Sequence, residues 1–523
     1  ANHPEMRLFS VPRSVAYEPE TTLNTSNPLQ SRWLVCSPET VGAGGWGGFS
    51  AAAYYFGRDL HTTLKVPIGL IHSSWGGTIA EAWTGAEGLK TVDDFKDRIE
   101  AFEEQVRIAN QGGANLEKRR EDWWTANDDG VQSGWANLDF DASDWKTLDG
   151  QPRIWEASGL PDLNGIVWFR KRIELPETWV GIAATLHLAM IDDIDTTFVN
   201  GVAVGGMQDW QSQRRYTLPA GLLEAGENIV AIRVLDTGGD GGLHGSAEAM
   251  KLTGPAQADI ALSGTWHIKV SSRTADLKPY PQQMHGGANQ PTVLYNGMIA
   301  PLLPFAIKGA IWYQGEANAG RAEEYRKLLP AMITNWRAKF GVGDFSFLIV
   351  QLANFMGPQQ SPAEGGWALI RDAQYATARD VPNCGLASAI DIGEAGDIHP
   401  RNKQEVGRRL ALIARAKTYG EKIEYSGPVF KSMTIQGNEI ALTFDHIGGG
   451  LVAKGDKVVG FGIAASDQSF VFAEAHIAGD KVIVSAPGLS APVAVCYAWA
   501  SNPVGNLTNK EGLPAVPFMT QSE

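Results

Sequence analysis

The stretch VPIGLIHSSWGGT, residues 66–78, decides the fold class of this 523-residue chain. Its apolar run ends in HSS and then in Gly76-Gly77, which is typical of a buried parallel strand followed by its carboxyl-end turn. The segment before it, residues 49–64, has apolar side chains at helical spacing on one face: Ala52, Tyr55, Phe56, Leu60 and Leu64. A helix leading into a buried strand predicts an α/β domain.

The same alternation of strand and helix resumes after residue 307. Three further buried-type strands are predicted at residues 308–316, 345–355 and 385–393. Amphipathic helices are predicted at 321–340 and 402–420, and Gly420 closes the second. Pro330 is expected to kink the first of these helices or to divide it.

Two other regions consist of short strands without helices. From about Thr125 to Lys278, apolar and polar residues alternate in short runs broken by Gly, Asp and Asn, and Asn200-Gly201 is a hairpin signal. This pattern predicts an inserted antiparallel β-sandwich. Short strands return after Ile423 and predict a small C-terminal β domain. The predicted organisation is therefore 1–124 and 279–422 for the α/β domain, 125–278 for the insert and 423–523 for the last domain.

Charge and composition exclude several classes of function. The 44 basic and 58 acidic residues give a net charge of -14, which argues against nucleic acid as a partner. No apolar run approaches the roughly 18 residues of a membrane helix. The cysteines, Cys36, Cys384 and Cys496, lie far apart and show no paired metal-type spacing, so no metal site is expected.

Candidate site residues cluster at the ends of the predicted strands, where ligands bind in parallel α/β sheets. His399 lies in a short loop with Asp397 two residues before it and Asp391 at the preceding strand end. An imidazole near carboxylates can act as a general base. The alternative is a surface histidine at the entry of a helix.

Two other strand ends, with Gly76-Gly77 and with Gln314-Gly315, suggest a site for a developing negative charge. Backbone N–H groups of Gly76 and Gly77, and the amide of Gln314, could stabilise an oxyanion. Glu316 could serve as an acid, as a base or as a bridge between loops, with the bridge favoured. Asn318 could bind substrate or hold the loop.

A nucleophile is not evident. The sequence contains no GxSxG elbow, no HExxH zinc motif and no Walker loop. Ser73 and Ser74 end a strand, but they directly precede the Gly76-Gly77 pair, where an oxyanion loop is expected instead.

Four stretches together resemble the sialate O-acetylesterase-like branch of the SGNH hydrolases: residues 56–83, 294–319, 367–374 and 397–411. The resemblance covers roughly half of the chain. It implies a flavodoxin-like three-layer α/β fold with a parallel sheet, and the insert resembles galactose-binding-like sandwiches. The activity implied is serine-type removal of O-acetyl groups from saccharides, hemicellulose oligosaccharides or sialic acids, without a metal or other cofactor.

The resemblance also implies residue roles. His399 becomes the general base, Gly77 an oxyanion donor, and Gln314 lies in the block that supplies another donor. Many SGNH enzymes place the aspartate three residues before the histidine, where this chain has Gly396. The orienting group therefore stays open between Asp397, Asp391 and a backbone carbonyl.

The GQSN-type block that carries the family's nucleophile is absent from this sequence. We therefore expect an N-terminal fragment, separate from this chain, to supply the serine. An acetylated oligosaccharide is the expected substrate, and secretion or periplasmic residence is implied by the family. The alternatives are a catalytically incomplete carbohydrate-binding protein that uses tryptophans of the insert, and a glycosidase with Glu316 and Asp391 as its carboxylate pair.

Overall fold

The computed structural model divides the chain into two compact units, residues 1–107 with 285–523 (unit 1) and residues 108–284 (unit 2). It describes residues 2–23, 30–43, 47–111, 116–148, 155, 160, 163–237, 241–244, 246–254, 258–277, 280–281, 287–303, 305–363, 365–467 and 469–520. The predicted boundary at 124 lies inside unit 2, and the boundary at 278–279 lies outside the described residues. The C-terminal strands belong to unit 1 instead of forming a unit of their own.

Unit 1 contains two three-stranded sheets of its α/β part. The first has the order β2-β1-β3, with β1 (His3–Ser10) antiparallel to β2 (Trp33–Cys36) and parallel to β3 (Ile68–His72). The second has the order β15-β16-β17 and is wholly parallel, formed by Gly309–Trp312, Ser346–Gln351 and Cys384–Ser388. The predicted mixed α/β class is confirmed, but in the part of the chain that the structure describes these strands form two sheets and not one continuous sheet.

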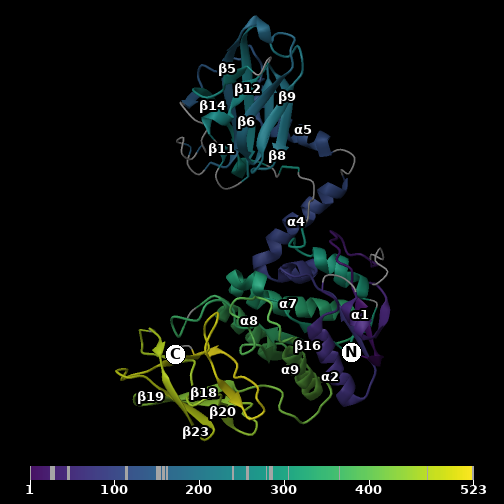
Figure 1. Cartoon of the computed structure of the whole chain (residues 1–523), viewed down its shortest axis with the longest axis vertical. Helices are drawn as coiled ribbons and strands as arrows, with labels where there is room; N and C mark the ends of the chain where they lie inside the picture. Colours follow the sequence, from purple (N-terminus) through teal and green to yellow (C-terminus); the bar gives the residue numbers. More distant parts are fainter. Residues whose placement is uncertain are drawn as a thin grey trace. The chain divides into compact units, whose positions relative to one another are not determined.

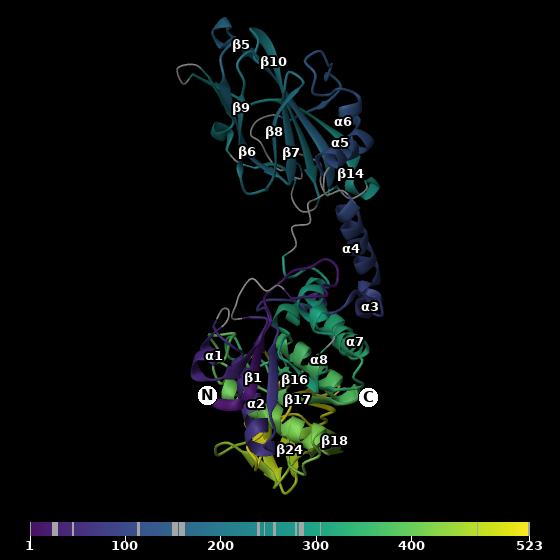
Figure 2. The ribbon, with the colours of Figure 1, turned by 90° about the vertical axis from the view of Figure 1, so that its right-hand side faces the viewer.

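Helices lie on both faces of the second sheet (Figure 2). The helices α2 (Ala51–Leu64) and α9 (Lys403–Ile413) share a core with Leu348 and Val350 of β16. On the other face, Trp336 of α7 (Ala322–Phe340) contacts Phe347 of β16, with ring centroids 5.9 Å apart. The helix α8 (Trp367–Asp380) completes this part of unit 1.

Two predictions about these elements need correction. The helix α7 is not divided at Pro330, where Leu328, Leu329, Met332 and Ile333 around the proline are fully buried and hold both halves together, so of the two effects predicted for Pro330 the division is wrong. The strand β3 is half-buried and not buried, since only one of its edges is paired within the described ranges. By contrast β16, paired on both sides, is buried from Phe347 to Gln351.

The last part of unit 1, called here the C-terminal β region, is built from short antiparallel strands (Figure 1). Its strands are β18 (Val429–Gln436), β19 (Glu439–Asp445), β20 (Leu451–Ala453), β21 (Phe461–Ala464), β22 (Val471–Phe472), β23 (Glu474–Ala478), β24 (Lys481–Ser485), β25 (Ala494–Tyr497), β26 (Leu507–Asn509) and β27 (Phe518–Met519). They enclose a core of their own that includes Ile440, Ile463, Val484 and Val495.

Unit 2 has two antiparallel sheets that enclose a common core. The larger has the order β4-β14-β5-β10-β7-β8, and the smaller β11-β6-β12-β13 with β9 paired to β6. The strands are β4 (Lys146–Leu148), β5 (Gly165–Leu175), β6 (Ala184–Asp192), β7 (Ile194–Val199), β8 (Val202–Gln208), β9 (Gln213–Leu218), β10 (Gly226–Asp236), β11 (Gly242–His244), β12 (Lys251–Thr253), β13 (Asp259–Ala261) and β14 (Trp266–Arg273). Asn200 and Gly201, both with positive φ, form the predicted hairpin turn between β7 and β8.

The other α-helices are α1 (Pro38–Gly42), α3 (Ala86–Leu89), α4 (Asp93–Gln111), α5 (Leu116–Asn127) and α6 (Asp129–Gln132). Within the described residues, no helix has the length and apolar character needed to cross a membrane.

Candidate active site

The turn after β3 is open on the side where a ligand could approach. Gly77 has φ +76°, a conformation that favours glycine, and no atom lies within 4 Å of where a Cβ would stand on Gly76 or Gly77. Both glycines are exposed. The turn can therefore present backbone N–H groups to a substrate, as the oxyanion prediction requires.

A buried polar network ties this turn to the one after β15. Asn318 is 1% exposed; its Nδ2 donates to Glu81 Oε2 at 2.9 Å, and its Oδ1 accepts from the Ala80 N–H at 2.9 Å. Glu81, also 1% exposed, pairs with Arg321 at 2.5 Å. Asn318 thus holds the loop, which is one of the two roles predicted for it, and Glu81 shares in this bridge, whereas the bridging role of Glu316 stays a prediction.

The amide of Gln314 belongs to the same network. Its Nε2 donates to the Thr78 carbonyl at 3.0 Å and to Asn318 Oδ1 at 2.7 Å, which uses both amide hydrogens. Its Oε1 is buried and has no hydrogen-bond partner among the described residues. In this arrangement Gln314 has no donor left for an oxyanion, so that role would require it to release one of its two partners.

Glu316 follows Gln314 and lies close to the predicted base. Burial raises the pKa of the Glu316 carboxyl, while the positive charges of Lys403 and His399 act against that shift. Lys403 Nζ in turn lies 5.0 Å from the ring centre of Tyr313. The structure therefore brings Glu316 and His399 into one electrostatic environment, although they are far apart in the sequence.

His399 stands on an exposed loop. Its side chain is 81% exposed, and its Nδ1 lies 3.7 Å from Asp397 Oδ1, beyond hydrogen-bond distance. The same oxygen accepts the backbone N–H of His399 at 2.8 Å. Asp397 therefore shapes the loop backbone, and a turn of the imidazole ring is needed before it can orient the base.

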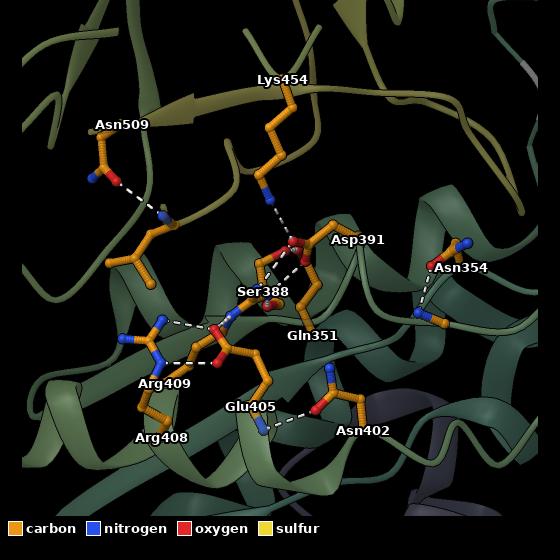
Figure 3. A network of polar contacts seen from close by, with 12 residues as sticks. Gln351, Asn354, Ser388, Asp391, Asn402, Glu405, Arg408, Arg409, Lys454 and Asn509 are labelled. Atoms are coloured by element: carbon orange, nitrogen blue, oxygen red, sulfur yellow. Dashed lines mark hydrogen bonds and ion pairs between the residues drawn. The ribbon is translucent and has the colours of Figure 1, made fainter. Parts of the chain in front are cut away.

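Asp391 is bound elsewhere (Figure 3). Both of its oxygens accept from Arg409, at 2.6 and 3.0 Å, and Lys454 lies 3.5 Å away. Arg409 also bonds the Ser388 carbonyl at 2.5 Å and Glu405 at 2.9 Å. These contacts give Asp391 a structural role at the start of the His399 loop and do not favour it as the orienting acid or as half of a glycosidase pair.

Three residues that hold these turns were not expected from the sequence: Glu81, Arg321 and Arg409. Glu81 could have been found, because an acid inside the apolar run IAEAW is unusual unless it is paired. Arg321 and Arg409 carry no such signal, because the contacts that matter here, with Glu81 and with Asp391, join segments that are separated in the sequence.

His72, the last residue of β3, was also missed. Its Nε2 lies 2.5 Å from Ser74 Oγ, and its ring packs edge-on against Phe49. Burial, assisted by the charge of Arg13, lowers the pKa of His72 to about 4. The imidazole is therefore neutral at neutral pH.

This lowered pKa predicts an acid-sensitive stability. The unfolded chain binds a proton at His72 as the pH falls through 6.5, whereas the folded chain does so only near 4, so unit 1 loses about 2 kcal/mol of unfolding free energy between pH 7 and pH 5. We expect His72→Gln to remove that part of the loss in chemical denaturation at the two pH values. His476→Gln, at an exposed position, should leave the loss as it is.

Comparison with known proteins places this site in context. A family model for "Carbohydrate esterase, sialic acid-specific acetylesterase" matches residues 284–415. The sialate O-acetylesterase of Pongo abelii is 30% identical over 264 residues, which are 45% of this chain and 49% of that protein. The Mus musculus protein is 36% identical over 178 residues, 31% of this chain and 33% of that protein.

The chain is similar to the sialate O-acetylesterase-like carbohydrate esterases. This confirms the predicted resemblance. The chain spans about half or less of the length of these curated relatives. A crystal structure of a carbohydrate acetylesterase from Xanthomonas citri matches 100% of this chain and 74% of its own, with a TM-score of 0.58 and 28% identity.

The esterase-like match coincides with part of the site. Residues 284–415 include β15, the turn with Gln314 and Glu316, and the loop with His399. The Gly76-Gly77 turn lies outside that stretch, and the structure joins it to the matched part through Glu81 and Asn318.

Proposed function

We propose that this chain is the larger part of a serine-type carbohydrate O-acetylesterase, and that unit 1 is an SGNH-type domain which receives its nucleophile on an additional strand. The observation that carries the proposal is a pair of unpaired strand edges, on β3 and on β15. Among the described residues β3 pairs only with β1, and β15 only with β16. The turns that follow these strands carry Gly77 and Glu316.

The two edges are suited to receive a strand. Exposed or half-buried residues predominate in β3 and β15, in contrast to the buried β16. Ile68 of β3 and Ile311 of β15 both pack against the same two cores, one centred on α2 and α9 and the other on β1 and α2. Unpaired backbone groups in such a position cost free energy, which a parallel strand between β3 and β15 would recover.

The proposed reaction follows from a serine at the carboxyl end of that strand. The serine Oγ attacks the acetyl carbonyl while His399 accepts its proton, and the Gly77 N–H and the serine's own N–H stabilise the oxyanion. His399 then gives the proton to the departing sugar hydroxyl. Water, activated by His399, releases acetate from the acetyl-serine. Glu316 and Asp397 are the carboxylates placed to stabilise the imidazolium.

The experiment locates the reactive serine. Purified material is treated with a fluorophosphonate, which labels activated serines, and intact and peptide masses are measured alongside hydrolysis of 4-nitrophenyl acetate. We expect the label on a segment outside residues 1–523 that co-purifies with this chain and carries a GQSN-type serine. A label on a serine of this chain would overturn the proposal.

Ser74 is the matched control within the chain, because His72 already contacts its hydroxyl. We expect Ser74→Ala to change the turnover of 4-nitrophenyl acetate by less than about threefold, since the attacking serine lies elsewhere. Loss of the label and of turnover in Ser74→Ala would assign the nucleophile to this chain instead.

A carbohydrate-binding protein without catalysis is the second candidate function. Eight tryptophans of unit 2 are buried: Trp123, Trp124, Trp135, Trp145, Trp155, Trp168, Trp179 and Trp266. Trp210, 57% exposed, favours this candidate because its ring is free to stack on a sugar. Binding of an oligosaccharide that Trp210→Ala abolishes, without ester turnover in any assembly, would support it over the esterase.

A further inference from the structure

The loop that carries His399 is attached to the C-terminal β region at its beginning. Ile390, which precedes the loop, belongs to the buried core of that region together with Phe461 and Tyr497. Lys454, directly after β20, extends toward Asp391, with Nζ 3.5 Å from Oδ2 (Figure 3). Ile390 and Asp391, which begin the segment leading to His399, are thus held by contacts with the C-terminal β region.

A pair of asparagines makes the next attachment. Asn354 Oδ1 accepts the backbone N–H of Gly393 at 2.7 Å, and its Nδ2 donates to Asn502 Oδ1 at 2.9 Å. Asn502 Nδ2 donates to the Met356 carbonyl at 2.6 Å, and the Met356 N–H donates to the Ala395 carbonyl at 3.1 Å. Two routes of hydrogen bonds therefore connect Asn502 to the His399 loop, one through Asn354 and one through Met356.

The packing around Gly393 leaves little freedom for this link to shift. A Cβ on Gly393 would stand 1.9 Å from the Asn354 carbonyl oxygen and 2.5 Å from its Oδ1. The loop backbone therefore lies directly against Asn354.

Arg371 fixes the other side of the link. Its side chain is fully buried and donates to four backbone carbonyls: Leu352 at 2.7 Å, Ala353 at 2.6 Å, Ala500 at 2.6 Å and Ser501 at 2.8 Å. Two of these carbonyls follow β16 and two precede Asn502. The guanidinium thus holds the segments of Asn354 and Asn502 side by side.

We propose that the C-terminal β region holds the His399 loop in position. Asn354 and Asn502 are the positioning residues through which it does so. The role of the loop in catalysis rests on the proposed function. Its restraint by Asn354 and Asn502 is independent of that function. The region then contributes to the reaction without touching substrate.

Hydrogen exchange of the complete chain tests the restraint directly. In Asn354→Ala and in Asn502→Ala we expect the Gly393 amide to exchange about tenfold faster or more, because the hydrogen bonds that close the loop are lost. Asn354→Asp keeps an oxygen that can accept the Gly393 N–H. The Gly393 amide should therefore exchange more slowly in this variant than in Asn354→Ala. Asn509→Ala removes a buried asparagine of β26, whose bonds go to Ser426, His446 and Leu513, and should leave Gly393 unchanged.

Steady-state kinetics of the active assembly test whether the restraint of the loop affects catalysis. We expect Asn502→Ala to lower kcat for an acetyl ester about tenfold while KM stays within about twofold, because a displaced base slows the chemistry and not the binding. Unchanged exchange at Gly393 in both alanine variants would overturn the proposal, and so would faster exchange with an unchanged kcat. If the wild-type material shows no turnover, the proposed function fails. The exchange rates of Gly393 alone then decide whether Asn354 and Asn502 restrain the loop.

Discussion

His399→Ala is expected to lower kcat for an acetyl ester by about a thousandfold or more, in the assembly that contains the serine, because the proton of the attacking hydroxyl then has no acceptor. KM should change little, since the His399 side chain is 81% exposed and packs against few groups. The measurement is steady-state hydrolysis of 4-nitrophenyl acetate with variant and wild type at equal concentration.

His476→Ala serves as the control for this substitution, because His476 is also exposed but lies on β23 in the C-terminal β region. Its turnover should equal that of the wild type. Turnover of His399→Ala within about threefold of wild type would remove His399 from the reaction and with it the proposed mechanism.

Asp195→Asn is expected to lower the unfolding free energy of unit 2 by about 3–5 kcal/mol, because it leaves a buried arginine without its counter-charge. Asp195 and Arg214 form an ion pair at 2.7 Å with both side chains 0% exposed. Tyr216 and Thr197 also donate to this carboxylate. Denaturant unfolding followed by tryptophan fluorescence measures the change, since unit 2 holds eight buried tryptophans.

An exposed ion pair of the same unit provides the comparison. Lys251 and Asp259 lie 2.7 Å apart with side chains 38% and 43% exposed, so Asp259→Asn should cost less than about 1 kcal/mol. Equal effects of the two substitutions would show that burial does not set the strength of the Asp195–Arg214 pair.

Elements whose signal is local were predictable from the sequence. The helix α2, the parallel strand β16 and the hairpin at Asn200-Gly201 each follow from a periodicity or a turn preference within a few residues. Pro330 shows the limit of such reasoning, because the proline allowed a division of the helix that the burial of its neighbours in α7 prevented.

Site residues were predictable in their position but not in their partners. Strand ends indicated the turns that carry Gly77 and Glu316, which follow β3 and β15 in two different sheets, and the structure brings the charges of Glu316 and His399 close together. Asp391 and Asn318 were read as candidates for chemistry, yet Arg409 and Glu81 engage them in structural contacts. No spacing rule reveals such pairs, since their members lie 18 and 237 residues apart.

The sequence by itself thus determined the mixed α/β class, the positions of the strand-end turns and the resemblance to carbohydrate esterases, because each depends on short-range patterns. Only the tertiary structure decided that β3 and β15 each have one edge without a partner among the described residues, that Asp391 is held by Arg409, and that the C-terminal β region contacts the His399 loop. These features depend on hydrogen bonds and burial between segments far apart in the chain, and such contacts exist only once the whole chain has packed.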